Sequence, residues 1–597
     1  MIKRVGQGVA AAAVLIGFIT ILARVVGFAK QLVLARTVGT NCLATAYFTA
    51  NQVPNIVFEV VVGGALAGMV VPVLAGAASR SLTPDTGVRV RAGGAPADSG
   101  ESAAESVRAR DEVGVITSAL LTWVLVLLVP LSVVTVLAAH PVIELFAGEV
   151  KGCATGDLTA VATRMLAVFA PQIPLYGLAV VLYGVLQAHR RFTGPAVAPL
   201  VSSLVVVFAY LAFVPLSEGV KDPLSAVPRP AELALSVGTT LGVLALVVAV
   251  IGPSSRLGLR LRPTLRFPEG VAVRVRRLAV AGLSALVAQQ AAMALVVWLA
   301  NRQVGAGGLA GYNYAWAIYQ VPYAVLAVPI ATSVFPALSA RAERGDGDGF
   351  AALSAQTTRA VVLVSGLAAG ALAAVAAPVA AVFVEGMASD VSAGQLARSI
   401  ALFAPGLIGY GLIAHLSRVL YAAGKGRAAA AGMVTGWLVV MVAQTAFVLA
   451  FPGPWKLGGL ALGSAAGMTA GGALLLAAVA RTRGSAALAG VVRASLAAVL
   501  GGGAGFLAGL LIISRLSVHG PVANVGVAAL AGLAAVTVSL AVVLVMDRRD
   551  LASVLSRVRG RGTDQGRQAD ADAGGIVAAG EAGRVVDGRR EGNDGDG

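Results

Sequence analysis

The sequence predicts an all-α polytopic membrane protein with about 14 transmembrane helices, and three observations support this class. Hydrophobic residues make up 57% of the 597 residues and charged residues only 12%, about half the share of a soluble domain. The mean hydropathy is +0.85. The apolar runs are continuous over about 20 residues or more, whereas β-barrel strands alternate over about ten.

Apolar runs long enough to cross a bilayer predict fourteen spans with approximate bounds. They cover residues 8–35, 42–76, 113–140, 158–187, 195–216, 231–253, 278–301, 310–338, 357–384, 396–422, 428–451, 458–480, 491–513 and 522–546. The first span resembles a signal peptide, but no cleavage site follows it, so we expect an uncleaved helix. Residues 78–112 are rich in Gly, Ser and Pro and predict a flexible cytoplasmic loop. Residues 547–597 contain too few apolar residues to form a core and predict a disordered cytoplasmic tail.

The net charge of +16 comes from basic connections between the spans. With an even number of spans, both termini and alternate connections share one side, and that side carries about three times as many Lys and Arg as the other. The richest connection holds Arg256, Arg260, Arg262, Arg266, Arg274, Arg276 and Arg277. The positive-inside rule therefore predicts that both termini are cytoplasmic. No basic stripe is interleaved with aromatic residues, so we expect no nucleic-acid partner.

Two stretches of the chain recur. RMLAVFAPQIPLYGL (164–178) matches RSIALFAPGLIGYGL (398–412) at a shift of 234, and AYFTANQVPNIV (46–57) matches YAWAIYQVPYAV (314–325). Both matches relate spans that are six apart, so the copies run in the same direction. We predict two parallel six-helix repeats (helices 1–6 and 7–12) around a central cavity plus two extra C-terminal helices, which is a transporter architecture. The predicted units are bundles at 1–253 and 254–480, helices 13–14 at 481–546, and the tail.

Two predicted spans carry equivalent Gln-Val-Pro motifs, at 52–54 and 320–322. Proline kinks a helix, and polar side chains inside a membrane are tolerated where they face protein or a wet cavity. We therefore predict that both helices line the cavity near kinks at Pro54 and Pro322, although one neutral kink is the alternative for each. The candidate substrate-binding residues are Asn51, Gln52, Asn55, Glu59, Asn313 and Gln320.

Arg24 and Lys30 are cations inside the first span, six residues and about 9 Å apart along a helix. Gly27 is a candidate hinge, because a bend there would bring both cations to one face. Two interpretations stay open: Arg24 or Lys30 forms an ion pair with Glu59, or both cations line an anion-binding cavity. Lys30 could also reach an interface, and we expect this snorkelling for Arg164, Arg359 and Arg398 near predicted helix ends.

Other chemistry is sparse in the sequence. The four histidines, His140, His189, His415 and His519, show no metal-ligand spacing, so we expect no metal or other cofactor. No catalytic triad, paired carboxylates or nucleotide-binding motif is present, so we expect no enzyme and no ATP-driven cycle. Cys42 and Cys153 fall in predicted outer loops or at their edges, where a disulfide and two free thiols are equally compatible with the sequence.

The stretch from residue 23 to 74 resembles the opening of the MurJ/MviN family of lipid II flippases, which belongs to the MOP exporter superfamily, and the second Gln-Val-Pro helix resembles actinobacterial-type members. The residues that carry the likeness are Arg24, Gly27, Pro54, Asn55, Gly64, Ala65 and Pro72. The sequence departs from the family pattern at Lys30, Gln31, Thr45, Phe58, Glu59, Gly63 and Ala317. At each of these positions the family pattern has a different residue that is charged, and at Lys30, Phe58, Glu59 and Ala317 the family residue is arginine.

The resemblance implies a flippase that moves lipid II from the inner to the outer leaflet of the bacterial cytoplasmic membrane by alternating access. Its implied partners are an undecaprenyl-diphosphate-linked lipid, membrane lipids, and proteins of cell-wall synthesis or division. A sodium site between helices 7, 11 and 12 is implied for some members, but the corresponding spans here contain no Asp or Glu. Two alternatives remain: a MOP transporter of another polyprenyl-diphosphate-linked glycan or a drug, and a non-transporting cell-wall scaffold that acts through its tail.

Overall fold

The computed structural model describes residues 2–60, 70, 74, 99–267, 271–387, 389–516 and 518–546. The first lobe consists of α1 (Ile2–Thr37), α2 (Cys42–Val57), α4 (Ser99–Leu137), α5 (Ala139–Ala147), α6 (Thr155–Phe169), α7 (Gln172–Ala188), α8 (Thr193–Leu216), η2 (Leu224–Ala226) and α9 (Arg229–Ser255). The second lobe consists of α10 (Val271–Leu299), η3 (Ala300–Val304), α11 (Gly308–Pro322), η4 (Tyr323–Ala327), α12 (Val328–Glu343), α13 (Gly347–Ala374), α14 (Ala376–Val384), α15 (Ala393–Phe403), α16 (Gly406–Ala422), α17 (Gly426–Ala450), η5 (Gly453–Trp455) and α18 (Lys456–Arg483). The short helix η6 (Ser485–Leu488) then leads to α19 (Val491–Arg515) and α20 (Pro521–Met546).

The predicted all-α membrane fold is confirmed. Twelve described helices are long and apolar enough to cross a membrane, and the pair α15 and α16, bent by 43°, adds a thirteenth span. The remaining predicted span, 42–76, begins as α2 and then lies mostly outside the described residues. So do most of the predicted loop and the whole tail. Residues 99–112 are a correction, because they form the start of α4 and not a loop; this part is rich in Ala, Glu and Arg, which favour helix.

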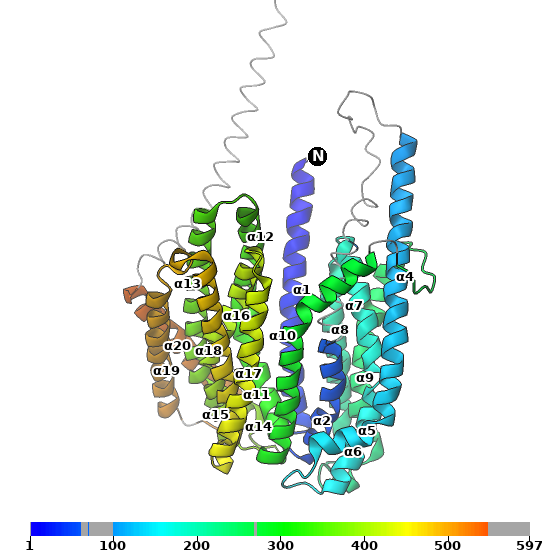
Figure 1. The fold of residues 1–597 in the computed structure, drawn as a ribbon. Coiled ribbons are helices and arrows are strands. Elements are labelled where there is room, and N and C mark those ends of the chain that lie inside the picture. Colours follow the sequence, from blue (N-terminus) through cyan, green and yellow to red (C-terminus); the bar gives the residue numbers. More distant parts are fainter. Residues whose placement is uncertain are drawn as a thin grey trace, which may run out of the picture.

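The two lobes repeat the same order of elements. In each, a nine-residue helix (α5 or α14) precedes a span that breaks at an Ala-Pro step, Ala170-Pro171 between α6 and α7 and Ala404-Pro405 between α15 and α16. A proline at such a step removes a backbone donor and favours the break. Figure 1 shows the lobes as two bundles, with α19 and α20 at the outer side of the second. The exact boundaries of the predicted units stay predictions.

Helices α19 and α20 pack through small residues. A Cβ added at Gly370 of α13 would overlap the backbone of Gly502 in α19, and one at Gly505 would overlap Ser539 of α20. Glycines at such points allow helix backbones to approach closely in a membrane, where packing drives association.

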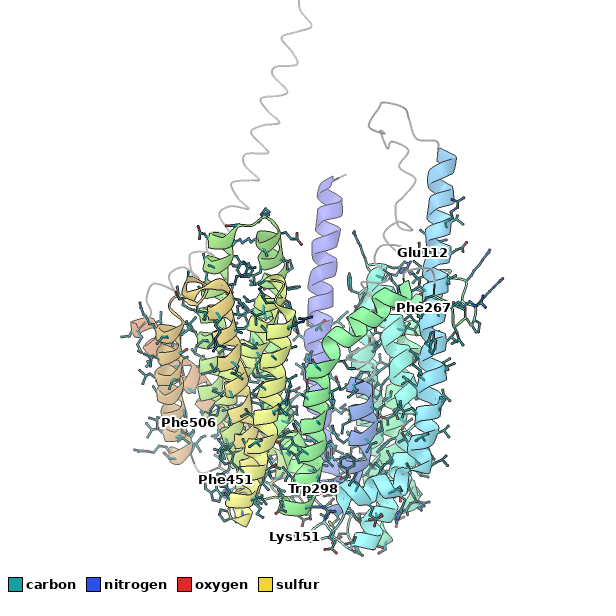
Figure 2. All side chains as sticks on the ribbon, in the orientation of Figure 1. Glu112, Lys151, Phe267, Trp298, Phe451 and Phe506 are labelled. Atoms are coloured by element: carbon teal, nitrogen blue, oxygen red, sulfur yellow. A yellow bond between two sulfur atoms is a disulfide. The ribbon has the colours of Figure 1, made fainter. Side chains whose placement is uncertain are left out.

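The lobes are hydrogen-bonded to each other at the end where α1 passes into α2. We call the segments Gly39–Thr40, Gly305–Gly307 and Ser389–Val391 the interlobe contact. The amide of Asp390 donates to the carbonyl oxygen of Thr40 at 2.7 Å, and the amide of Ala306 donates to that of Lys151 at 2.9 Å. Figure 2 labels Lys151 at this end and Glu112 and Phe267 at the opposite end.

Two covalent or ionic features tie the first lobe together. A disulfide joins Cys42, the first residue of α2, to Cys153 just before α6, which resolves the open alternative for these cysteines. Arg164 forms a bidentate ion pair with buried Glu232, with N–O distances of 3.0 and 2.7 Å. Snorkelling alone, which we expected for Arg164, therefore does not explain its position, because its guanidinium forms an ion pair with a carboxylate on α9.

Candidate functional site

Helix α1 presents its two cations at different depths. Arg24 and Ile21 are exposed, Lys30 is half-buried, and Leu34 is fully buried. The first half of the span is thus free of close packing while the second half packs among other helices, and Figure 1 shows α1 between the two lobes. The helix runs through Gly27 without interruption, and a Cβ there would meet no atom within 4 Å. A hinge at Gly27 stays a prediction.

Both Gln-Val-Pro motifs lie where an α-helix changes into a π-helix. Residues 58–60 follow Pro54 in this conformation, and Tyr323–Ala327 follow Pro322. Each proline lacks the N–H that would continue the regular hydrogen-bond pattern, and π turns of this kind are frequent at functional sites. The two motifs are therefore equivalent in backbone structure as well as in sequence.

The candidate amides are partly shielded from solvent. Asn51 has a buried side-chain oxygen that accepts no hydrogen bond from the described residues. Gln52 and Gln320 are half-buried, and Asn313 donates to the carbonyl oxygen of Leu309 on its own helix at 2.8 Å. Such amides keep donor and acceptor capacity that a polar ligand could use.

Each motif contacts a tyrosine from a later helix of its own lobe. The Tyr176 hydroxyl of α7 donates to the Asn55 side-chain oxygen at 3.4 Å, and Tyr410 of α16 stacks on Tyr323 with ring centroids 3.8 Å apart. Asn55 and Tyr323 occupy equivalent positions, one residue after the proline, and the two tyrosines are the pair aligned by the shift of 234. Equivalent positions are therefore in contact in each lobe, through a hydrogen bond in the first lobe and through ring stacking in the second. The repeat in the sequence aligns Tyr176 with Tyr410, but the sequence analysis did not predict either as a site residue.

Glu59 follows the first kink and lies within electrostatic range of Tyr176 of the first lobe and of Tyr410 of the second lobe. Among the described residues, no ion pair joins Arg24 or Lys30 to Glu59. The ion pairs found in this part of the chain, from Arg164 and Arg229, both use Glu232. This arrangement favours the anion-binding interpretation of the two α1 cations over the interpretation as a closing ion pair.

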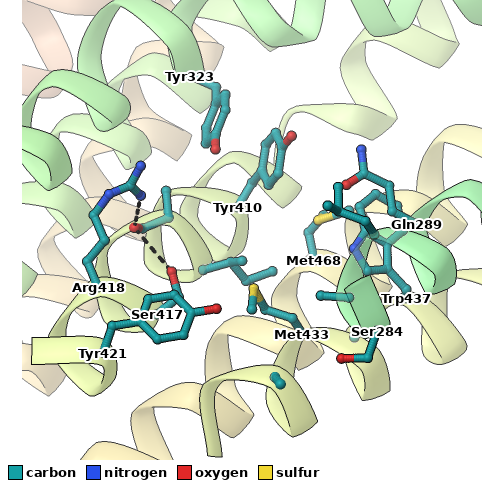
Figure 3. A pocket seen from close by; sticks show the side chains of 16 residues that line it. Ser284, Gln289, Tyr323, Tyr410, Ser417, Arg418, Tyr421, Met433, Trp437 and Met468 are labelled. Atoms are coloured by element: carbon teal, nitrogen blue, oxygen red, sulfur yellow. Dashed lines mark hydrogen bonds between the residues drawn. The ribbon is translucent and has the colours of Figure 1, made fainter. Parts of the chain in front are cut away.

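A cavity of about 310 Å³ lies in the second lobe between α10, η4, α16, α17 and α18. Arg418 of α16 lines it together with Tyr323 and Tyr410, as Figure 3 shows. The sequence analysis missed Arg418. The signal that could have identified it was a guanidinium inside an apolar run, in the predicted span 396–422.

The described part of the chain contains no cluster of side chains suited to bind a metal ion. No group of three or more His, Cys, Asp or Glu residues lies together there. His415 is buried on α16, where Thr357 lies within hydrogen-bond distance of its Nε2, at 3.0 Å.

Two parallel helical repeats that meet at one end, with a cationic helix between them, define a membrane transporter of the alternating-access class. The family described as "Lipid II flippase MurJ" matches residues 34–522, and this chain belongs to that family. The family is one of transporters and not of enzymes, as expected. Arg24 and Lys30 precede the matched residues, so the match says nothing about them.

Individual relatives agree with the family. The lipid II flippase MurJ of Burkholderia cenocepacia is 27% identical over 411 residues, which cover 68% of this chain and 71% of that protein. The probable lipid II flippase MurJ of Rhizobium tropici is 28% identical over 410 residues, covering 68% and 69%.

Solved structures show the same fold. One described as lipid II flippase MurJ in an inward closed conformation has a TM-score of 0.65 at 17% identity and covers 90% of this chain and 99% of that one. An inward-facing multidrug resistance MATE family transporter of the MOP superfamily has a TM-score of 0.56 at 15% identity, covering 77% and 98%.

Proposed function

We propose that this chain translocates lipid II from the inner to the outer leaflet of the bacterial cytoplasmic membrane by alternating access. The observation that carries the proposal is the exposed Arg24 on a helix between two lobes that are hydrogen-bonded to each other at the far end. A lipid-linked diphosphate is an anion that needs a cationic, polar path, while its prenyl chain can stay in the lipid.

We assign the interlobe contact to the outer face and both termini to the cytoplasm. The basic segment that ends at Phe267 lies at the end away from Lys151, in keeping with the positive-inside rule. The disulfide of Cys42 lies next to the interlobe contact, and disulfides persist in oxidising compartments outside the cytoplasm. In this orientation the lobes are closed on the outside, and the exposed half of α1 faces the cytoplasmic side.

Recognition of the head group would divide between the cations and the amides. Arg24 and Lys30 attract the diphosphate, and Arg24 offers paired donors that suit phosphate oxygens. The sugar and peptide hydrogen-bond to Asn51, Gln52, Asn55, Asn313 and Gln320, and to Glu59 as an acceptor. The irregular turns after Pro54 and Pro322 are the points at which the helices flex as access changes. Gly27 is a further hinge. A membrane potential or an ion gradient drives the transport cycle. Proteins of cell-wall synthesis or division would bind to the tail at 547–597.

The experiment that tests this function is complementation. A bacterial host is depleted of its own lipid II flippase, this chain is expressed, and lipid II is measured in the outer leaflet. The chain is expected to restore translocation, and Arg24→Ala is expected to reduce it about tenfold or more, because a hydrogen bond to a charged group is worth about 1.5–3 kcal/mol. Arg344→Ala, an exposed arginine at the end of α12, is the matched control and should act like the unaltered protein.

Two results would contradict the proposal. One is failure to restore translocation by protein that is folded in the membrane. The other is restored growth without outer-leaflet lipid II that disappears when 547–597 is deleted, since that pattern indicates a scaffold acting through the tail. A flippase should keep most of its activity without the tail.

A further inference from the structure

The cavity of the second lobe is built entirely by that lobe. Its volume of about 310 Å³ is at the lower end of the range for small-molecule sites, about 300–1,000 Å³. It lies beside the second proline kink, since Tyr323, the residue after Pro322, forms part of its wall.

The charge of this cavity is positive. Its lining includes one guanidinium, that of Arg418, and no Asp or Glu. The guanidinium donates to the carbonyl oxygen of Ala414 on its own helix and, within the described residues, forms no ion pair with a carboxylate. A guanidinium has five N–H donors, so several remain for a ligand, and a half-buried cation favours an anion close to it.

Neutral donors surround the cation. Figure 3 shows Arg418 on one side of the cavity, Gln289 and Trp437 on the other, and the stacked Tyr323 and Tyr410 between them. Tyrosine hydroxyls, an amide and an indole N–H all donate hydrogen bonds, and the aromatic faces can pack against a sugar ring. This set of side chains suits an oxyanion that is covalently attached to a flat, partly apolar group such as a sugar ring.

A cation of α1 lies near the same wall of the cavity. Tyr323 lies within electrostatic range of both Arg418 and Arg24. Arg24 belongs to a helix that contacts α8 of the first lobe, whereas Arg418 belongs to the second lobe. An anion held at this point is therefore attracted from both lobes at once.

We propose that the Arg418 pocket binds the diphosphate of the lipid-linked substrate, with Arg24 contributing from the opposite lobe. The proposal rests on the function proposed above and adds a binding site in the second lobe. Because a soluble nucleotide sugar carries the same diphosphate, the lipid-linked and the soluble source have to be compared directly.

The test measures binding to the full chain in lipid nanodiscs. The probes are undecaprenyl diphosphate, undecaprenol, which has no charge, and UDP-MurNAc-pentapeptide as the soluble diphosphate. Undecaprenyl diphosphate should bind at least tenfold more tightly than undecaprenol. Arg418→Gln should remove this difference in affinity. Arg418→Lys should restore part of it, because lysine keeps the charge without the planar donor set. The control Arg344→Gln should leave the difference unchanged. Equal affinity of Arg418→Gln and the unaltered protein for undecaprenyl diphosphate would overturn the proposal.

A second measurement needs no substitution at Arg418. In the unaltered protein, hydrogen exchange in the peptide that covers 413–421 should slow with undecaprenyl diphosphate and not with undecaprenol. Protection elsewhere but not in this peptide would overturn the site. If only UDP-MurNAc-pentapeptide protects it, the pocket takes the soluble source and the lipid-linked assignment is wrong.

Failure of the site and failure of the function are distinguishable. A chain that restores lipid II translocation while Arg418→Gln binds and translocates normally keeps the function and loses the site. A chain that binds undecaprenyl diphosphate through Arg418 but does not restore lipid II translocation keeps the site and loses lipid II as the substrate.

Discussion

Equivalent residues of the two lobes have different chemistry. In the first lobe the residue after the proline is Asn55, which accepts a hydrogen bond from Tyr176; in the second it is Tyr323, which stacks on Tyr410. The first pair presents an amide, whereas the second presents an aromatic surface next to Arg418. We infer that the lobes contact different parts of one asymmetric ligand, the first through hydrogen bonds and the second through charge and stacking.

We expect the carboxyl group of Asp390 to make the interlobe contact sensitive to pH. Burial, and secondly the negative charge of Asp222, raise the pKa of Asp390. Asp222 lies in the first lobe, between α8 and α9, so this repulsion requires the lobes to be in contact. An acid whose pKa is raised in the closed state stabilises that state while protonated, and the stabilisation is lost as pH rises through the raised pKa. The contact should be strongest near and below the ordinary aspartate pKa of about 3.9 and should weaken above it.

A buried cysteine reports this effect. In the variant Thr49→Cys, the new thiol is covered while the lobes are closed, since Thr49 is buried and its hydroxyl accepts a hydrogen bond from the Asn301 amide of the second lobe at 3.0 Å. Its labelling from outside, normalised to a free thiol at each pH, should speed up as the pH rises from about 4 through the raised pKa of Asp390. Asp390→Asn should remove this rise, and Asp348→Asn, at the exposed start of α13, should not. A labelling rate that does not change with pH in the parent variant would show that Asp390 has no part in closure.

At the scale of whole elements, the irregular turns after the two prolines are the parts of the helices best suited to move. Pro322→Ala returns a backbone donor to α11 and favours a regular α-helix, in which proline is worse than alanine by about 3 kcal/mol. Regular helix would shift Tyr323 away from Tyr410. We expect translocation of lipid II by reconstituted protein to fall about tenfold, equal to about 1.4 kcal/mol in the barrier, without loss of thermal stability.

The matched control is Pro130→Ala. Pro130 is an exposed proline inside α4, which continues as α-helix to Leu137. This variant should translocate lipid II normally. Equal activity of the Pro130 and Pro322 variants would mean that the π turn at Tyr323–Ala327 is only a local accommodation of proline.

The elements differ in how far sequence could predict them. Long apolar runs predict spans because a helix must satisfy its backbone inside lipid, and two equal shifts predict the repeat. The breaks at Pro171 and Pro405 are harder to foresee, because a proline in an apolar run is compatible with a kink or with two helices, and packing decides between them. The Cys42–Cys153 bond and the Arg418 pocket depend on residues that are distant in sequence. Such proximity is set by the tertiary fold. Residue type alone therefore left the disulfide as one of two alternatives and did not reveal the pocket.

For the whole molecule, function requires the interlobe contact to form and break. Gly307 lies at its centre with φ of +70°, and its amide donates to the Thr45 hydroxyl at 2.9 Å. A Cβ at this position would overlap the carbonyl oxygen of Thr40 in the other lobe. Gly307→Ala should therefore destabilise the closed lobes specifically.

Gly345 provides the control for this last prediction, because it has the same φ of +70° and a Cβ there would meet no atom within 4 Å. Both alanine variants carry the backbone strain of a left-handed residue, about 1–3 kcal/mol, but only Gly307→Ala adds the clash between the lobes. With Thr49→Cys as the reporter, Gly307→Ala should increase outside labelling at least tenfold over Gly345→Ala, which corresponds to a population shift of about 1.4 kcal/mol. Lipid II translocation should fall in the same variant, because fewer molecules are closed on the outside and able to load from the cytoplasm. If both variants label alike, contact between Gly307 and Thr40 does not control opening, and the outer gate must be sought in another part of the interface.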